Sequence, residues 1–307
     1  MTTNTHTNRM DHTNRLIVIQ GPTGVGKSAA GVVLGRHYGA PVVSADSRQV
    51  YREMAIGTAV PSLAEREGVP HYFIQNKSIH EPFTAGDYER EALALLDNEL
   101  FPNTPDVLLV GGSGLYVNAL LEGFDDLPES DPALRAELTA MPLAVLLEEL
   151  ERSDPAYYAV VDRQNPQRVI RAVEVCRLSG RPYSALRSGV VKQRNFTPIK
   201  IGIDLPREEL YARIDRRVEQ MVSDGLVAEA ERLYPDRHLS ALQTVGYREL
   251  FDHFDGRCSL AKAVELIQRN TRRYAKRQLT WLRRDPQIRW FGPTDTEAMT
   301  AYIDGNL

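Results

Sequence analysis

The chain has 307 residues, of which 42% are hydrophobic and 25% are charged, as in ordinary globular proteins. It lacks an apolar run of the roughly 18 residues that a membrane-spanning helix needs, so no such helix is expected. The two cysteines lack the spacing of a metal or disulfide framework, which fits a cytoplasmic protein, and the net charge of −4 argues against general affinity for nucleic acid.

The N-terminal segment is polar. Residues 1–15 are rich in Thr, Asn and His and have no apolar centre, so we expect a disordered tail and no signal peptide. The apolar run over 16–20 then predicts a buried strand, and residues 29–34 predict the start of a helix.

A phosphate-loop pattern, G-x-x-x-x-G-K-[ST], lies between that strand and that helix. Its positions are Gly21, Pro22, Thr23, Gly24, Val25, Gly26, Lys27 and Ser28. In this context backbone N–H groups cradle phosphate oxygens, the lysine supplies a cation, and the serine hydroxyl is offered to Mg²⁺. A glycine turn with a surface lysine is the alternative. The pattern favours binding of a diphosphate or triphosphate.

Strands and helices alternate in the next part of the chain. Residues 40–45 predict a second strand, 57–82 a loop-rich segment and 85–100 a helix. A third strand is predicted over 106–110, and the glycine turn 111–114 leads from it into another helix. This alternation indicates a parallel sheet that is covered on both faces.

The pattern then becomes purely helical before it returns to the sheet. Helices are predicted over 132–138, 142–151, 154–162 and 166–178, the last closed by Gly180. Residues 198–205 read as a strand, and long helical segments follow over 208–233, with a possible break at Gly225, and over 260–282. We therefore predict an α/β fold with a P-loop NTPase-like parallel sheet core and an inserted helical domain. The predicted bounds are 16–124 and 195–307 for the core and 125–194 for the insertion.

Asp46 follows the second strand, at the edge of the sheet where ligands of open α/β folds bind. Three roles remain open for this carboxylate: it ligates Mg²⁺, accepts a proton from a nucleophile, or caps a turn with Ser47. The third strand ends in a glycine turn instead of an acidic residue, which weakens an ATPase reading. Ser113 in that turn either faces the same site or caps the turn.

A group of arginines lies on the helix predicted over 208–233. Arg213 and Arg217 are four residues apart and share a face, and Arg216 is adjacent. Guanidinium groups suit a diphosphate because they bind two oxygens at once. The acids Asp215 and Glu219 make a solvated charged face the alternative.

The segment 268–284 contains seven Lys or Arg residues and no acid. Four of them form one stripe of the predicted helix: Arg269, Arg273, Lys276 and Arg277. Tyr274 and Trp281 are predicted to point elsewhere. In a net-acidic chain such a stripe favours contact with a phosphate backbone, and Arg168 and Arg171 form a smaller basic cluster in the insertion.

Taken together, these segments resemble the tRNA dimethylallyltransferase (tRNA isopentenyltransferase) family over residues 16–290. The matching motifs are Gly-Pro-Thr-x-x-Gly-Lys-Ser at 21–28, Ser-Ala-Asp-Ser-Arg-Gln-Val-Tyr at 44–51, Ile-Gly-Thr-Ala at 56–59, Gly-Gly-Ser-Gly-Leu-Tyr at 111–116, Asn-Pro-Gln-Arg-Val-Ile-Arg-Ala at 165–172, Val-Gly-Tyr-Arg-Glu at 245–249 and Thr-Arg-Arg-Tyr-Ala-Lys-Arg-Gln-Leu-Thr-Trp at 271–281. The resemblance implies transfer of a dimethylallyl group from dimethylallyl diphosphate to the N6 amine of adenosine 37, 3′ to the anticodon, in tRNAs that read codons beginning with U.

The resemblance also implies roles for individual residues. The phosphate loop holds dimethylallyl diphosphate with Mg²⁺, Asp46 acts as the general base, and Arg217 assists the diphosphate. Ser113 stands where the family usually has a threonine that contacts tRNA. The residues expected to bind the tRNA anticodon stem-loop, by resemblance or by charge, are Asp46, Ser47, Arg48, Gln49, Ser113, Arg135, Gln167, Arg168, Val169, Ile170, Arg171, Gln243, Thr244, Val245, Gly246, Tyr247, Arg248, Arg273, Lys276 and Arg277. We expect base flipping and a monomer.

Two other functions compete with this interpretation. A small-molecule P-loop kinase would share the phosphate loop but has no need of the basic segment 268–284. A non-catalytic RNA-binding protein with a vestigial nucleotide site would need that segment but not Asp46 in register with the loop.

Overall fold

The computed structural model describes residues 14–187 and 189–306, so the predicted tail over residues 1–13 lies outside the described residues. The predicted tail included Arg15, but this residue is the first of the first strand. Its guanidinium donates to Asp106 at 2.5 and 2.8 Å and so fixes the start of the core. No helix in the described residues is both long and apolar enough to cross a membrane.

The chain divides into two compact units. One unit consists of the described residues up to 121 together with those from 194 onward, and the other is 122–193. The predicted bounds of the insertion, 125–194, differ from the second unit by a few residues. Each unit is described separately below.

A parallel sheet forms the centre of the first unit, in the order β3-β2-β4-β1-β5-β6. The strands are β1 Arg15–Gln20, β2 Val42–Ser44, β3 His71–Tyr72, β4 Asp106–Gly111, β5 Thr197–Ile203 and β6 Arg289–Phe291. The predicted parallel sheet is therefore confirmed. The sequence did not predict β3 and β6, because strands of two and three residues are too short to show a periodicity.

The helices of the first unit include those predicted from periodicity. They are α1 Lys27–Tyr38, α2 Ala85–Leu95 with a π-helical turn Leu96–Leu100, α3 Gly114–Glu122, α9 Arg207–Ser223, α10 Leu226–Leu233, α11 Tyr247–Phe254, α12 Leu260–Leu282 and α13 Thr296–Asp304. The predicted break at Gly225 is confirmed, since this residue has a φ of 104° between α9 and α10. α11 and α13 were not predicted.

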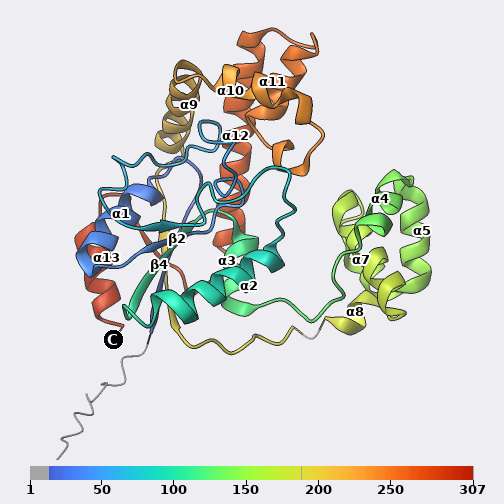
Figure 1. Ribbon diagram of the computed structural model, residues 1–307, viewed down its shortest axis with the longest axis horizontal. Helices are drawn as coiled ribbons and strands as arrows, with labels where there is room; N and C mark the ends of the chain where they lie inside the picture. Colours follow the sequence, from blue (N-terminus) through green and yellow to red (C-terminus); the bar gives the residue numbers. More distant parts are fainter. Residues whose placement is uncertain (1–13, 188, 307) are drawn as a thin grey trace, which may run out of the picture. The chain divides into compact units, whose positions relative to one another are not determined.

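The two faces of the sheet bury two separate apolar clusters. In β1, Leu16 and Val18 point into one cluster, while Ile17 and Ile19 point into the other. Residues of α2, α3 and α12 join the first cluster, and residues of α1 and α13 join the second. In Figure 1, α1 and α13 accordingly lie together on one side of the strands, while α2 and α3 lie on the other. A strand buried on both faces reads as a continuous apolar run, which is what the sequence shows.

The second unit is helical, as predicted. Its helices are α4 Pro132–Ala140, α5 Leu143–Ser153, α6 Pro155–Val160, α7 Pro166–Ser179 and the unpredicted short α8 Tyr183–Leu186. Asp131, Asp154 and Asn165 cap the N-termini of α4, α6 and α7 through their side chains, and Gly180 ends α7 in a left-handed conformation. The unit has its own apolar core, which includes Leu146.

Candidate functional site

Three loops that follow β1, β2 and β4 meet at one edge of the sheet, because parallel strands all end at the same edge. A small cavity of about 70 Å³ lies there. Its lining includes Thr23, Lys27, Ser28, Asp46, Gln49, Gly111, Arg217 and Gln278. The structure therefore brings the phosphate loop, Asp46 and Arg217 together, although they lie far apart in the sequence.

The phosphate loop has the backbone conformation that its glycines allow. Gly24 and Gly26 have φ values of 81° and 108°, and Gly26 is the left-handed N-cap of α1. Lys27 donates from Nζ to the carbonyl oxygen of Pro22 at 2.8 Å. Burial, opposed by the attraction of Asp46 and assisted by the repulsion of Arg217, lowers the pKa of Lys27 to about 8. An anion bound in the loop would stabilise the charged form.

Asp46 caps its own loop, as one of the three open roles requires. Its Oδ1 accepts hydrogen bonds from the backbone N–H groups of Arg48 at 2.9 Å and Gln49 at 3.4 Å. Its Oδ2 has no hydrogen-bond partner among the residues that the structure describes. One oxygen thus fixes the position of the carboxylate, and the other is open to a ligand.

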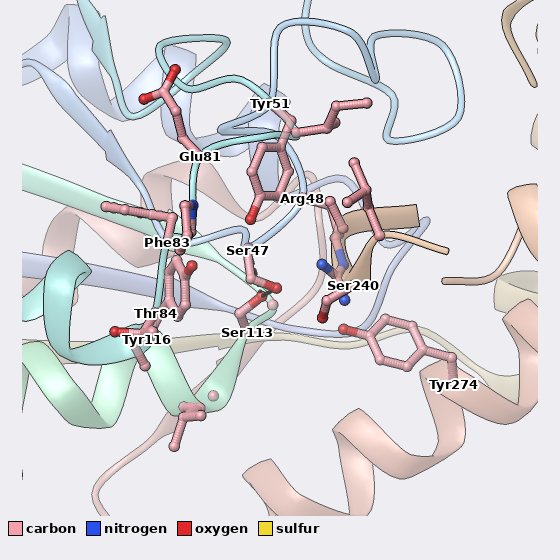
Figure 2. Close-up of a pocket in the computed structure, with 18 of the residues that line it drawn as sticks. Ser47, Arg48, Tyr51, Glu81, Phe83, Thr84, Ser113, Tyr116, Ser240 and Tyr274 are labelled. Carbon is pink, nitrogen blue, oxygen red and sulfur yellow. Dashed lines mark hydrogen bonds between the residues drawn. The ribbon is translucent and has the colours of Figure 1, made fainter. Parts of the chain in front are cut away.

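Ser113 joins the glycine turn after β4 to the loop that contains Asp46. Its Oγ accepts from the Ser47 N–H at 3.0 Å and donates to Ser47 Oγ at 3.2 Å. Its own N–H donates to the Ala45 carbonyl at 3.1 Å. Figure 2 shows the side chains of Ser47 and Ser113 directed toward each other. Ser113 therefore faces the Asp46 loop, and Ser47 and Ser113 both line the larger cavity described below.

The arginines of α9 have different surroundings. Arg217 is half-buried and lines the small cavity. Burial lowers the pKa of its guanidinium below the ordinary arginine value, although the charges of Asp46 and Glu65 oppose this shift. Arg213 pairs with Glu209 at 3.1 Å, and Arg216 is exposed. Of the three, Arg217 is therefore the one placed beside both Lys27 and Asp46.

Gln278 is a site residue that sequence reasoning missed. Its Oε1 accepts from the Thr23 N–H at 2.9 Å, and its Nε2 donates to the Gly112 carbonyl at 2.9 Å. The side chain is 9% exposed and joins α12 to both loops. A glutamine inside a basic segment carries no sequence signal for this contact, because its partners lie more than 160 residues away.

A larger cavity of about 740 Å³ opens beside Ser47, Arg48 and Ser113. From α12 it is lined by Tyr274, Arg277, Gln278 and Trp281. The prediction that Tyr274 and Trp281 point away from the basic stripe is therefore wrong, because both line the same cavity as Arg277. In Figure 2 the Tyr274 hydroxyl points from α12 toward Arg48 and Ser240.

Most of the predicted basic stripe lines a neighbouring cavity of about 390 Å³. Its lining residues are Arg273, Lys276, Arg277, Thr280, Trp281 and Arg284. Arg269, one turn earlier on α12, is exposed and lines neither cavity. The stripe thus offers basic groups around an indole ring, a combination suited to phosphates and stacked bases.

The predicted tRNA-binding residues of the insertion have largely structural surroundings. Glu174 is fully buried, and its Oε2 accepts from Arg135 at 2.9 Å and from Arg171 at 2.8 Å. Arg135 also donates to Gln167 at 3.0 Å. The side chains of Val169 and Ile170 lie in the apolar core of the unit, so they are not presented to a ligand, whereas Arg168 is exposed.

The segment 243–248 combines a buried anchor with accessible residues. Tyr247 is fully buried and donates from its hydroxyl to Glu229 at 2.7 Å. Glu229 also accepts from the backbone N–H groups of Ala55, Ile56 and Gly57 at 2.8–3.0 Å. Thr244, Val245 and Gly246 line a third cavity, while Gln243 and Arg248 are exposed. Tyr247 therefore supports the 55–57 loop from the core, through the Glu229 carboxylate.

Comparisons with family models and with individual proteins point to the same family. A model of the IPP transferase family matches residues 49–285. The tRNA dimethylallyltransferase of Flavobacterium johnsoniae is 50% identical over 95% of this chain and 98% of its own length. That of Cytophaga hutchinsonii is 48% identical over 95% of this chain and 97% of its own length.

Solved structures agree with the sequence comparison. The tRNA isopentenylpyrophosphate transferase of Bacillus halodurans is 38% identical, with a TM-score of 0.70 over 95% of this chain and 96% of its own. A eukaryotic dimethylallyltransferase described as acting on tRNA is 25% identical, with a TM-score of 0.78 over 92% of this chain and 75% of its own. The matched sequence, the parallel sheet and the phosphate loop together place this chain in the IPP transferase family.

Proposed function

We propose that this chain transfers the dimethylallyl group of dimethylallyl diphosphate to N6 of adenosine 37, 3′ to the anticodon, in tRNAs that read codons beginning with U. The product is N6-isopentenyladenosine. One observation carries the proposal: Asp46 shares the small cavity with Lys27 and Arg217, while its neighbours Ser47 and Arg48 line the large cavity. The carboxylate thus lies between a site suited to an anion and a site large enough for a base.

The reaction forms a bond between N6 and C1 of the dimethylallyl group and breaks the bond from C1 to the diphosphate oxygen. The lone pair of an aromatic amine is delocalised into the ring, so N6 is a weak nucleophile. Proton transfer from N6 to Asp46 as the bond forms lowers this barrier. The open Oδ2 is the acceptor, since Oδ1 is held by Arg48 and Gln49.

The leaving diphosphate gains negative charge as the C–O bond breaks. The loop N–H groups, the Lys27 ammonium and the Arg217 guanidinium stabilise that charge in a partly buried site. The hydroxyl of Ser28 lines the same cavity and is the kind of hard oxygen donor that suits Mg²⁺. Ser28 is the residue that would hold the ion, which when bound offsets charge on the diphosphate.

The tRNA partner is the anticodon stem-loop, whose target base must leave the stack to reach the carboxylate. The large cavity supplies aromatic rings from Tyr51, Tyr274 and Trp281 for a splayed base, and Arg48 and Arg277 for phosphate. Both cysteines are free thiols, which fits action in the cytoplasm. We propose that the enzyme acts as a monomer.

The direct test is incubation with labelled dimethylallyl diphosphate and unmodified tRNA. Label should appear in RNA at adenosine 37 with the wild-type protein. RNA binding without transfer would instead favour the non-catalytic RNA-binding function. Transfer of phosphate from ATP to a small metabolite, with no label in RNA, would favour the kinase.

A further inference from the structure

A third cavity, of about 130 Å³, adjoins the diphosphate site. Four residues line both this cavity and the small one: Thr23, Asp46, Thr58 and Arg217. The two cavities therefore share a polar boundary at the group assigned as the base. We call the third cavity the side chamber.

The rest of the side chamber is largely apolar. Its apolar lining consists of Ile214, Val218, Met221, Leu226, Val245 and Ile267. Four of these side chains, on α9, α10 and α12, are at most 3% exposed, whereas Met221 and Val245 are half-buried. The remaining lining residues are Gly57, Thr244, Gly246, Thr271 and Tyr274. A cavity with this lining favours an apolar occupant with one polar end.

The size of the side chamber fits a small hydrocarbon group. An engineered apolar cavity of about 150 Å³ stays dry and binds benzene, a molecule of six carbons. A chamber of about 130 Å³ is thus matched to a branched group of five carbons and not to one of ten.

The geometry of α9 points to one residue that limits the length of this group. Arg217 and Met221 are four residues apart, so they share a face of the helix and lie about 6 Å apart along its axis. Arg217 lines the diphosphate site and the chamber, whereas Met221 lines the chamber only. A substrate with its diphosphate at Arg217 would therefore direct its tail toward Met221.

We propose that the side chamber holds the dimethylallyl tail and that Met221 restricts the enzyme to five-carbon diphosphates. This inference rests on the proposed function. The diphosphate lies in the phosphate loop, C1 lies at the shared boundary beside Asp46, and the methyl groups lie among the apolar side chains. Met221 closes space that a second isoprene unit would need.

The test compares dimethylallyl diphosphate with the ten-carbon geranyl diphosphate as donors to tRNA. M221A should raise the kcat/KM ratio of geranyl to dimethylallyl diphosphate at least about tenfold, since even one methylene in an apolar pocket changes selectivity about 10- to 200-fold. The volume-conserving M221L should keep the wild-type ratio. V222A is the matched control, because Val222 is the next residue of α9 and does not line the chamber.

A second measurement needs no variant. The wild-type protein should bind dimethylallyl diphosphate at least about tenfold more tightly than inorganic diphosphate, because the tail is buried in the chamber. Equal affinities, or a geranyl preference unchanged by M221A while dimethylallyl transfer persists, would overturn the assignment of the chamber. Absence of dimethylallyl transfer by the wild-type protein would instead refute the proposed function, and the binding comparison would still test the chamber.

Discussion

At the scale of the residue, the site depends on side chains with two tasks. Asp46 caps its loop with one oxygen and keeps the other open, and Gln278 holds two loops from a helix. Lys27 is charged at neutral pH only because its lowered pKa of about 8 still lies above 7.

Replacing Asp46 should separate chemistry from RNA binding. D46N keeps an oxygen that can accept from Arg48 but cannot accept a proton, and we expect its single-turnover rate to fall about 10³-fold. D46A should lose at least as much, while tRNA affinity stays close to wild type in both variants. Rates near wild type in D46N would remove Asp46 as the base.

Replacing Gln278 should impair the diphosphate site from a distance. Q278A leaves the Thr23 N–H and the Gly112 carbonyl without their partner, so we expect kcat/KM for dimethylallyl diphosphate to fall about tenfold. The matched control is Q268A, on the same helix, whose side chain contacts Asp215 and Glu219 instead. Equal effects of the two substitutions would show that α12 is merely destabilised.

The affinity for inorganic diphosphate should depend on pH through Lys27. The ammonium carries its charge below its pKa of about 8 and loses it above, so the lysine contribution is present at pH 7 and declines toward pH 9. In K27R the charge persists over this range. The ratio of wild-type to K27R affinity, measured by calorimetry, should therefore fall as pH rises, and a constant ratio would contradict the role of the ammonium.

At the scale of the element, α12 is the helix that joins substrate sites to the core. Ala263, Ala275 and Leu282 are buried, Gln278 reaches the phosphate loop, and the basic face lines two cavities. The sequence showed the basic stripe clearly because charge and helical period are local properties. The sequence-based prediction for Tyr274 and Trp281 was wrong, because the direction of an aromatic side chain depends on the neighbours that other helices and loops provide.

R273A should weaken tRNA binding and flatten its salt dependence. Each phosphate contact that is lost reduces the slope of log K against log salt by roughly 0.7–0.9. Arg257 is an exposed arginine paired with Asp252 and Asp255, so R257A serves as the control and should leave the slope unchanged. An unaltered slope in R273A would show that the stripe only contacts solvent.

At the scale of the whole molecule, the two units have separate apolar cores, and the helical unit also contains a buried carboxylate with its own hydrogen-bond donors. In the unit 122–193, burial raises the pKa of Glu174, but hydrogen bonds from Ser130, Arg171 and Arg135 outweigh it and leave the pKa below its ordinary value. The carboxylate therefore stabilises this unit at neutral pH, and that contribution is lost as pH falls below the ordinary glutamate range.

E174A should destabilise the helical unit selectively. Removing one partner of a buried ion pair costs about 3 kcal/mol, since two guanidinium groups lose their acceptor. Hydrogen exchange of the α7 amides should rise in E174A and not in E148A, a substitution of an exposed glutamate on α5. Exchange in β1 should stay unchanged in both variants, and a matching rise there would show that the units unfold together.

The sequence by itself determined the elements whose information is local. The phosphate loop, the apolar strands, the helical insertion and the break at Gly225 follow from spacing, periodicity and glycine conformation within short windows. The family resemblance added roles for site residues that the pattern already singled out: Asp46 as the base, Arg217 at the diphosphate and Ser113 at the tRNA. These features need no knowledge of what packs beside them.

Only the tertiary structure decided which residues meet. Gln278, the side chamber, and the inward positions of Tyr274 and Trp281 arise where helices distant in sequence pack against the sheet edge. Arg171 belongs to a basic cluster in the sequence and Arg135 is implied by the resemblance, and the structure adds that both donate to one buried carboxylate. An arginine looks the same in the sequence whether its partner is a carboxylate of the protein or a phosphate of a ligand. The partner is known only once the fold has placed the acceptor groups around it.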